Sequence, residues 1–148
     1  MIIEKNYKGE RVLVGQATVE AILANFQDFK ENFDSYLVNS KFLNEEIYFD
    51  EDIEILTVLG TWCKDSSREV ARFMKIIQAI DNYKCKLRFY GLHRNKKDKE
   101  GLAMLYNIRY LPTFVILKNG KELGRIVEKP TKLIEEDLFD ILNAANSK

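Results

Sequence analysis

The sequence is poor in the residues that build disulfide scaffolds and metal centres. Its 148 residues include two cysteines, one histidine, two prolines and seven glycines. Two cysteines are too few for a disulfide-stapled fold or a four-ligand zinc site. So little proline and glycine also argues against a long disordered linker. No metal or other cofactor is implied. A hydrophobic fraction of 46% in a chain of this length predicts one domain with a substantial core.

Charge of one sign and long apolar runs are also missing. Twenty-three basic and twenty-three acidic residues cancel, so no net field attracts nucleic acid or an anionic membrane. No apolar run approaches the roughly 20 residues that cross a bilayer. Residues 1–10 carry charges but no apolar signal-peptide core. We therefore expect a cytoplasmic protein without membrane or nucleic-acid partners.

Apolar periodicity and turn residues predict an alternating α/β order. Residues 1–17 indicate at most a short strand or an extended arm at 11–15. The elements expected after it are a helix over 18–37 capped by Thr18, a short helix at 42–47, a strand at Ile53–Leu59, a helix at 64–80, a strand at 87–92, a helix at 99–106, strands at 113–117 and 123–127 joined by Asn119-Gly120, and a last helix from Pro130. Strands joined by helical crossovers should run parallel, with the hairpin adding an antiparallel edge.

Two helices carry apolar stripes that predict core faces. In the first the stripe comprises Val19, Ile22, Leu23, Phe26, Phe29, Phe33 and Leu37. In the last it comprises Ile134, Leu138, Ile141 and Leu142. The first stripe could instead receive a partner peptide, but aromatic helix faces more often pack inside.

Cys63 lies where the buried strand passes into the helix at 64–80. Unpaired N–H groups and the helix dipole favour an anion there, so a thiolate would be stabilised. The thiolate is the nucleophile of disulfide exchange. Ser66 lies one turn later and is expected to donate a hydrogen bond to the sulfur. Asp65 opposes ionisation through its negative charge.

Here the chain resembles the thioredoxin family. The run Trp62-Cys63-Lys64-Asp65-Ser66 is similar to the family's Trp-Cys-x-x-Cys motif with its second cysteine replaced. Residues 106–114 resemble the cis-proline segment, and residues 118–122 resemble the edge hairpin that follows it.

The resemblance implies a three-layer thioredoxin-like fold with a mixed four- to five-stranded sheet and helices on both faces. It covers residues 51–148, so residues 1–50 would be an added N-terminal helical segment of a single domain over 1–148. The Trp-Cys-x-Asp-Ser motif is most similar to a divergent bacterial thioredoxin-like group.

The resemblance also assigns roles around the thiol. Pro112 would follow a cis peptide bond, and Leu111 would offer its backbone to an extended substrate beside Trp62. Two typical features are missing, because the family's buried acid falls at Thr57 and its helix-bending proline at Ala71.

Cys85 is too distant to act as a resolving thiol. About 17 helical residues at 1.5 Å each separate it from Cys63 by roughly 25 Å, whereas a disulfide needs Cα atoms within about 7 Å. We expect Cys85 to be a small, partly buried residue at a strand entrance. His93 and the charged residues 94–99 are expected to lie in a solvated surface loop.

These features favour a monothiol thiol-disulfide oxidoreductase, in which Cys63 forms mixed disulfides that an external thiol resolves. The partners would be protein or low-molecular-weight thiols and disulfides, and the protein a monomer. One alternative is a binding module that holds extended peptides without turnover. In another, Ser66 is an engineered replacement and the natural protein is a dithiol reductase.

Overall fold

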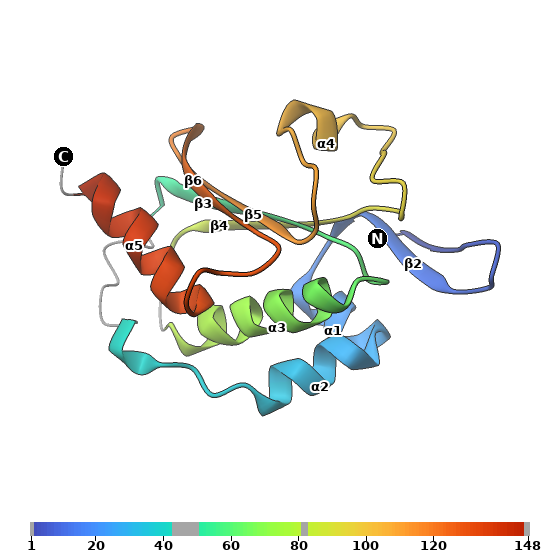
Figure 1. Cartoon of the computed structure of the whole chain (residues 1–148), viewed down its shortest axis with the longest axis horizontal. Helices are drawn as coiled ribbons and strands as arrows, with labels where there is room; N and C mark the ends of the chain where they lie inside the picture. The colour runs from blue at the N-terminus through green and yellow to red at the C-terminus, as the bar shows by residue number, and fades with distance from the viewer. Residues whose placement is uncertain (1, 43–50, 81–82, 147–148) are drawn as a thin grey trace.

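The structure, a computed structural model, describes residues 2–42, 51–80 and 83–146 (Figure 1). The strands are β1 (Ile2–Lys5), β2 (Arg11–Ala17), β3 (Ile53–Leu59), β4 (Lys86–Gly91), β5 (Thr113–Lys118) and β6 (Lys121–Val127). The helices are α1 (Val19–Asn25), α2 (Gln27–Ser35), α3 (Lys64–Ala79), α4 (Leu102–Leu105) and α5 (Ile134–Asn146), with a 3-10 turn η1 (Ser40–Phe42).

The strands form one sheet in the order β1-β2-β4-β3-β5-β6. β3 and β4 are parallel, and the other neighbouring strands are antiparallel. The predicted α/β thioredoxin-like class, with a mixed sheet and helices on both faces, is confirmed. The sheet has six strands rather than four or five, because the first 17 residues add β1 and β2 beside β4.

The direction of β5 corrects one prediction. β5 runs antiparallel to β3, although a helical crossover precedes it. The helix in that crossover, α4, has four residues and spans about 6 Å, whereas the seven-residue β3 is about 23 Å long. Such a short helix cannot carry the chain back along the sheet. β5 therefore starts beside the end of β3, with Thr113 opposite Val58.

β3 supplies core residues to both faces of the sheet because its side chains alternate. Ile53, Ile55 and Leu59 belong to the larger apolar cluster, which α1, α2, α3 and α5 cover. Leu56 and Val58 belong to a second cluster under α4. Figure 1 shows α4 on one side of the sheet and the longer helices on the other.

The helix predicted over residues 18–37 is divided into α1 and α2. The break is at Phe26, whose φ of −132° and ψ of 102° are those of extended backbone. Thr18 caps α1 as predicted, since its hydroxyl accepts a hydrogen bond from the Ala21 N–H at 3.1 Å.

The apolar stripe of this region is partly confirmed. Ile22 and Phe29 are fully buried in the larger cluster. Leu37 is 90% exposed, because α2 ends at Ser35 and the helical period ends with it. Residues 43–47 of the short helix predicted next lie outside the described residues.

The C-terminal hairpin and helix are present as predicted, although β6 begins at Lys121 rather than 123 and α5 begins at Ile134 rather than Pro130. Asn119 and Gly120 have φ values of 51° and 82°, as a two-residue type I′ hairpin requires. Ile134, Leu138 and Leu142 of α5 are buried against α3 and the sheet. Among the described helices, none is long and apolar enough to cross a bilayer.

Candidate active site

Cys63 is the residue at which α3 begins. Its backbone is still extended, with φ −101° and ψ 125°, and its carbonyl accepts the first helical hydrogen bond, from the Ser67 N–H at 3.0 Å. The residue is half-buried. N–H groups of the first helical turn have no partner inside the helix, so this position has a positive potential. The strand-to-helix junction is where the sequence predicts the cysteine.

The turn before Cys63 is held by both neighbouring elements. The Gly60 N–H donates to Ser66 Oγ of α3 at 3.1 Å, and Thr61 Oγ1 accepts from the Leu13 N–H of β2 at 3.2 Å. A Cβ on Gly60 would lie 2.6 Å from the indole of the next-but-one residue, Trp62, so the turn has no room for a side chain there. β2, which includes residues 11–15 where at most a short strand was expected, therefore helps to position the thiol.

Ser66 is fully buried, and its hydroxyl contacts the turn rather than the sulfur. The predicted hydrogen bond from Ser66 to Cys63 Sγ is not formed among the described residues. The buried N–H of Gly60 needs an acceptor, and the Ser66 hydroxyl supplies it. The sulfur instead donates to the Leu111 carbonyl oxygen at 3.6 Å.

The acidic residue beside the thiol is paired. Asp65 Oδ1 lies 2.7 Å from the Arg68 guanidinium, which also contacts Glu69 at 2.6 Å. Both members of the first pair are about one third exposed, so solvent screens them, but the cation still offsets the negative charge near the helix start. The repulsion expected from Asp65 is weakened accordingly.

The segment that precedes β5 closes the site opposite the helix start. The Leu111–Pro112 peptide bond is cis, and the Leu111 carbonyl faces the sulfur of Cys63. The Thr113 hydroxyl donates to the Tyr110 carbonyl at 2.6 Å, which ties the two sides of this bond together. The fold thus places Cys63 against residues 48 positions later in the chain.

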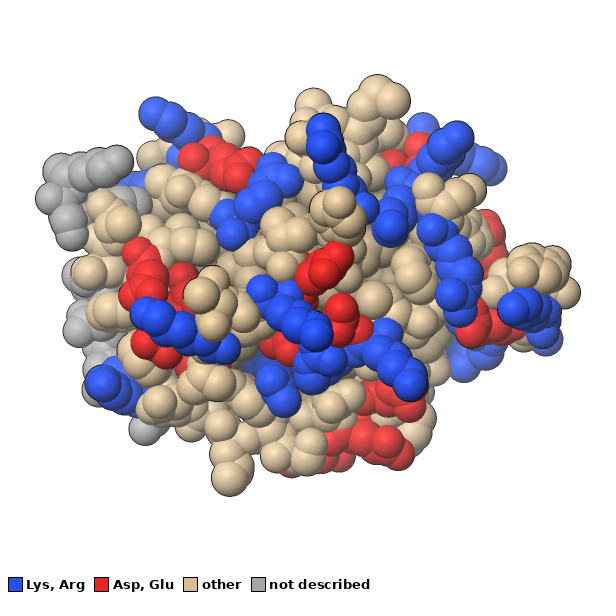
Figure 2. Space-filling model, in the orientation of Figure 1, with Lys and Arg blue, Asp and Glu red and all other residues tan. Residues whose placement is uncertain are grey.

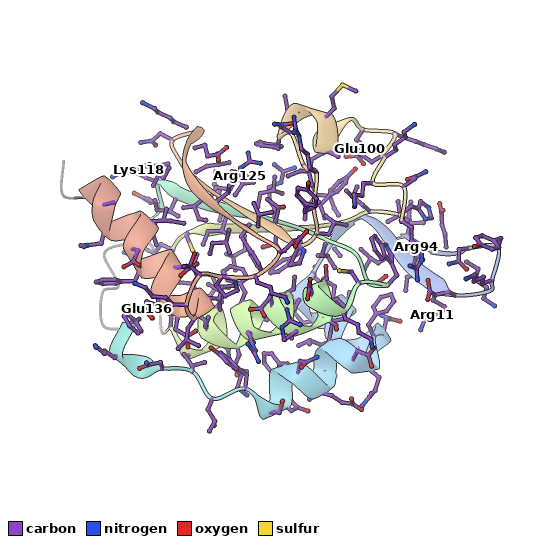
Figure 3. The ribbon with its side chains drawn as sticks, in the orientation of Figure 1. Arg11, Arg94, Glu100, Lys118, Arg125 and Glu136 are labelled. Atoms are coloured by element: carbon purple, nitrogen blue, oxygen red, sulfur yellow. The ribbon has the colours of Figure 1, made fainter. Side chains whose placement is uncertain are left out.

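Trp62 forms the rim of the site on the β4 side. Its indole N–H donates to the Leu92 carbonyl at 2.9 Å, and the Arg94 guanidinium lies 5.1 Å from its ring centroid. Arg94 also pairs with Glu10 of the β1–β2 connection at 3.2 Å. Figure 3 shows Arg94 at the end of the sheet where α3 begins. No local pattern in the sequence predicts this contact, because Glu10, Trp62 and Arg94 lie far apart in the chain.

The loop after β4 lies at the surface as predicted, with Arg94, Asn95, Lys97 and Lys99 exposed, but Asp98 within it makes specific polar contacts. Asp98 accepts hydrogen bonds from the Tyr90 hydroxyl at 2.8 Å and from the Leu102 N–H at 3.0 Å. Burial alone would raise the pKa of Asp98, but the hydrogen bonds from Tyr90 and from the backbone of α4 lower it. Burial and the neighbouring carboxylate raise the pKa of Tyr90.

A sequence relative identifies the family. No family model matches the chain. Thioredoxin AMT13 from Alternaria alternata is 30% identical to it over 101 residues, which are 68% of this chain and 80% of that protein. The chain belongs to the thioredoxin family.

Solved structures share the fold of this thioredoxin-family chain. A protein of unknown function from Pseudomonas aeruginosa has a TM-score of 0.63 at 14% identity and covers 89% of this chain and 93% of its own. An HIV epitope-scaffold has a TM-score of 0.56 at 16% identity and covers 90% of this chain and 88% of its own. Since about nine tenths of the chain is covered, the shared fold includes part of residues 1–50.

This thioredoxin-family chain departs from the typical pattern beneath the thiol. Thr57, at the position expected for the buried acid, is fully buried in β3, and its hydroxyl oxygen has no hydrogen-bond partner among the described residues. Ala71, at the position expected for proline, is buried in the middle of α3. Neither side chain can transfer a proton at neutral pH.

Cys85 lies away from the site, as predicted. It is 6% exposed and belongs to the larger apolar cluster just before β4. α3 is continuous over 16 residues, about 24 Å, between the two cysteines. Cys85 is thus more deeply buried than expected and out of reach of Cys63.

In residues 2–42, 51–80 and 83–146, no group of three His, Cys, Asp or Glu side chains is placed to bind a metal ion. His93 Nε2 is 2.8 Å from the Glu4 carboxylate, at the surface.

Proposed function

We propose that the chain is a monothiol thiol-disulfide oxidoreductase with Cys63 as its nucleophile. The observation that carries the proposal is the position of the sulfur, half-buried at the start of α3 and 3.6 Å from the Leu111 carbonyl. The helix start favours the thiolate. When the thiol ionises, its hydrogen bond to Leu111 is lost, and the sulfur is free to turn towards N–H groups or a substrate.

The reaction consists of two exchange steps. The Cys63 thiolate attacks one sulfur of a substrate disulfide, the substrate S–S bond breaks, and the other sulfur leaves as a thiolate that takes a proton from water. The thiolate of a protein or a low-molecular-weight thiol then attacks the substrate sulfur of the mixed disulfide, a new disulfide forms between these two sulfurs, and Cys63 leaves as a thiolate. The second step needs an external thiol because Cys85 is buried about one helix length away.

The remaining site residues take supporting roles in this proposal. Trp62 and the backbone beside the thiol at Leu111 and Pro112 would contact the substrate, while the side chains of Leu111 and Pro112 are buried. Ser66 is a positioning residue: it accepts a hydrogen bond from the Gly60 N–H and does not contact the sulfur. Residues 1–50 and the core at 51–148 form one domain, because β2 pairs with β4 and α1 and α2 share the larger cluster with α3. That the protein is a cytoplasmic monomer of a bacterial type stays a prediction.

A binding module is the second candidate, and Thr57 favours it. A family member without the buried acid and without a second thiol at Ser66 has lost two groups that assist turnover. If Ser66 instead replaces a native cysteine, the natural protein is a dithiol reductase. Comparison with the genomic reading frame tests that alternative.

The test is the rate at which Cys63 reacts with a chromogenic disulfide at neutral pH. We expect the chain to react at least tenfold faster than a free, unperturbed thiol and to form a mixed disulfide visible by intact-mass spectrometry. Cys63→Ala should abolish the adduct, and the matched variant Cys85→Ala should retain it. A rate equal to that of the free thiol would favour the binding module.

A further inference from the structure

A pocket of about 350 Å³ opens beside the segment that precedes β5. Its lining residues come from that segment, from the first residue of β5 and from β6: Asn107, Arg109, Tyr110, Thr113, Arg125 and Val127. Tyr110 and Thr113 flank Leu111 and Pro112, so the pocket begins one residue from the backbone that contacts the thiol. Figure 3 shows Arg125 on the side of the sheet that faces α4.

Arg109 gives this pocket a cation that has no carboxylate partner in the described part of the chain. The hydrogen bond that the structure records for it, among the described residues, runs from Nε to Asn107 Oδ1 at 3.4 Å, which is long and weak. Arg125 is different, because Glu122 binds its guanidinium through two hydrogen bonds of 2.7 and 2.8 Å. The available positive charge in the pocket is therefore that of Arg109.

The surroundings add a second cation and an apolar wall. The Lys96 ammonium lies 6.0 Å from the Tyr110 ring centroid. Tyr110 is 54% exposed and Val127 40%, so both offer apolar surface to a ligand. An acidic residue, Glu128, follows β6 beside this pocket. Its backbone N–H donates to the Pro112 carbonyl at 2.7 Å. Figure 2 shows basic side chains over the region between β6 and α4.

We propose that this pocket is a specificity subsite for an acidic side chain of an extended polypeptide disulfide. Tyr110 and Val127 would contact the methylene groups, and Arg109 would bind the carboxylate, an arrangement that a guanidinium makes with good geometry. A polypeptide lying along Leu111 and Pro112 reaches the pocket within about two residues, at about 3.3 Å each. The inference rests on the proposed function, because it concerns the substrate that Cys63 attacks.

Peptides with one cysteine activated as a thiopyridyl disulfide test this subsite. The Cys63 sulfur attacks the peptide sulfur, the bond to the pyridyl sulfur breaks, and thiopyridone leaves with a proton and is followed by absorbance. Each peptide carries Glu, Gln or Lys two residues before or after the cysteine. In one of the two positions we expect Glu to react at least fivefold faster than Gln, and Lys more slowly than Gln. High salt should reduce the difference, since exposed charges are screened.

Variants connect the preference to the pocket. Arg109→Gln should lower the rate with the Glu peptide at least fivefold and the rate with the Gln peptide less than twofold. Arg109→Glu should reverse the order in favour of Lys. Lys118→Gln is the matched control, because Lys118 pairs with the start of β3 at the end of the sheet opposite Cys63 (Figure 3). It should change no rate.

The outcomes separate this inference from the proposed function. If no peptide reacts faster than with Cys63→Ala, the oxidoreductase proposal itself fails. If Glu, Gln and Lys peptides react equally in both positions, or if the preference survives Arg109→Glu, the subsite is wrong while the oxidoreductase stands. If Arg109→Gln lowers the rate of reaction with oxidised glutathione but with none of the peptides, the pocket binds a small disulfide, and the polypeptide assignment is overturned.

Discussion

The two cysteines lie at opposite ends of α3, and their surroundings differ in kind. Cys63 is half-buried at the helix start, and hydrogen bonds fix the turn before it: Gly60 donates to α3, Thr61 accepts from β2, and Trp62 donates to the residue that follows β4. Cys85 is 6% exposed and packed among apolar side chains.

The difference shows how position decides the chemistry of a thiol. Cys63 is half-buried at the start of α3, where backbone N–H groups without a partner inside the helix create a positive potential. At Cys85 an apolar surrounding disfavours charge and excludes reagents. One end of α3 is organised by polar contacts, the other by packing, and each of the following predictions tests that contrast.

The largest effect is expected from Ser66→Cys, which adds a second thiol at the polar end. The Ser66 side chain is one helical turn from Cys63, a spacing that suits exchange. Reduction of insulin-type disulfides with a reductant supplied should rise at least tenfold over the native chain. The matched double variant Ser66→Cys, Cys63→Ala should be inactive. An inert Ser66→Cys protein would show that the groove or the proton path, and not the missing thiol, limits turnover.

Gly60→Ala should disturb the turn before Cys63, at the start of α3, through steric crowding. The new Cβ would lie 2.6 Å from the Trp62 ring, so the indole must move from the Leu92 carbonyl and from Arg94. We expect a loss of about 1–3 kcal/mol in the free energy of unfolding, measured by urea denaturation, together with a changed reaction rate of Cys63. Unchanged stability would mean that Trp62 is not fixed as described.

Asp98→Asn should lower the free energy of unfolding by about 1–2 kcal/mol at pH 7. The loop that it weakens follows Leu92, whose carbonyl accepts the hydrogen bond from Trp62. The pKa of Asp98 is lower in the folded than in the unfolded chain, so its stabilisation is present above the unfolded value, about 3.9, and is lost as pH falls through the folded value. Urea denaturation between pH 7 and pH 3 should therefore show a smaller acid loss in Asp98→Asn than in the native chain. Equal losses would contradict this assignment.

The smallest effect separates the two cysteines by stability alone. Cys85→Ala removes a buried sulfur from a packed cluster and should lower the free energy of unfolding by about 1 kcal/mol. Cys63→Ala removes a half-buried sulfur, and its free energy of unfolding should stay within about 0.5 kcal/mol of that of the native chain. Urea denaturation of both variants measures the pair. A larger loss from Cys63→Ala would reverse the contrast.

Local signals predicted the central elements well. The strand at Ile53–Leu59 has the predicted bounds, Thr18 caps its helix, and Asn119 and Gly120 form the expected turn. Each depends on residues that are neighbours in the chain, such as a cap and the N–H three positions later.

The errors concern partners that the chain brings from a distance. The Ser66 hydroxyl binds Gly60 because the turn before α3 folds back on it. Arg94 covers Trp62 because β1 and β2 join the sheet and bring Glu10 beside it. Neither contact leaves a periodic pattern in the sequence.

The sequence by itself determined the alternation of strands and helices, the burial of β3 and the placement of Cys63 at a helix start, since these follow from hydrophobic period and local backbone preference. The tertiary structure alone decided the reversed direction of β5, the sixth strand, the partner of Ser66 and the pocket at Arg109. Those features depend on which edge of the sheet each segment reaches, and that depends on packing the whole chain around two cores.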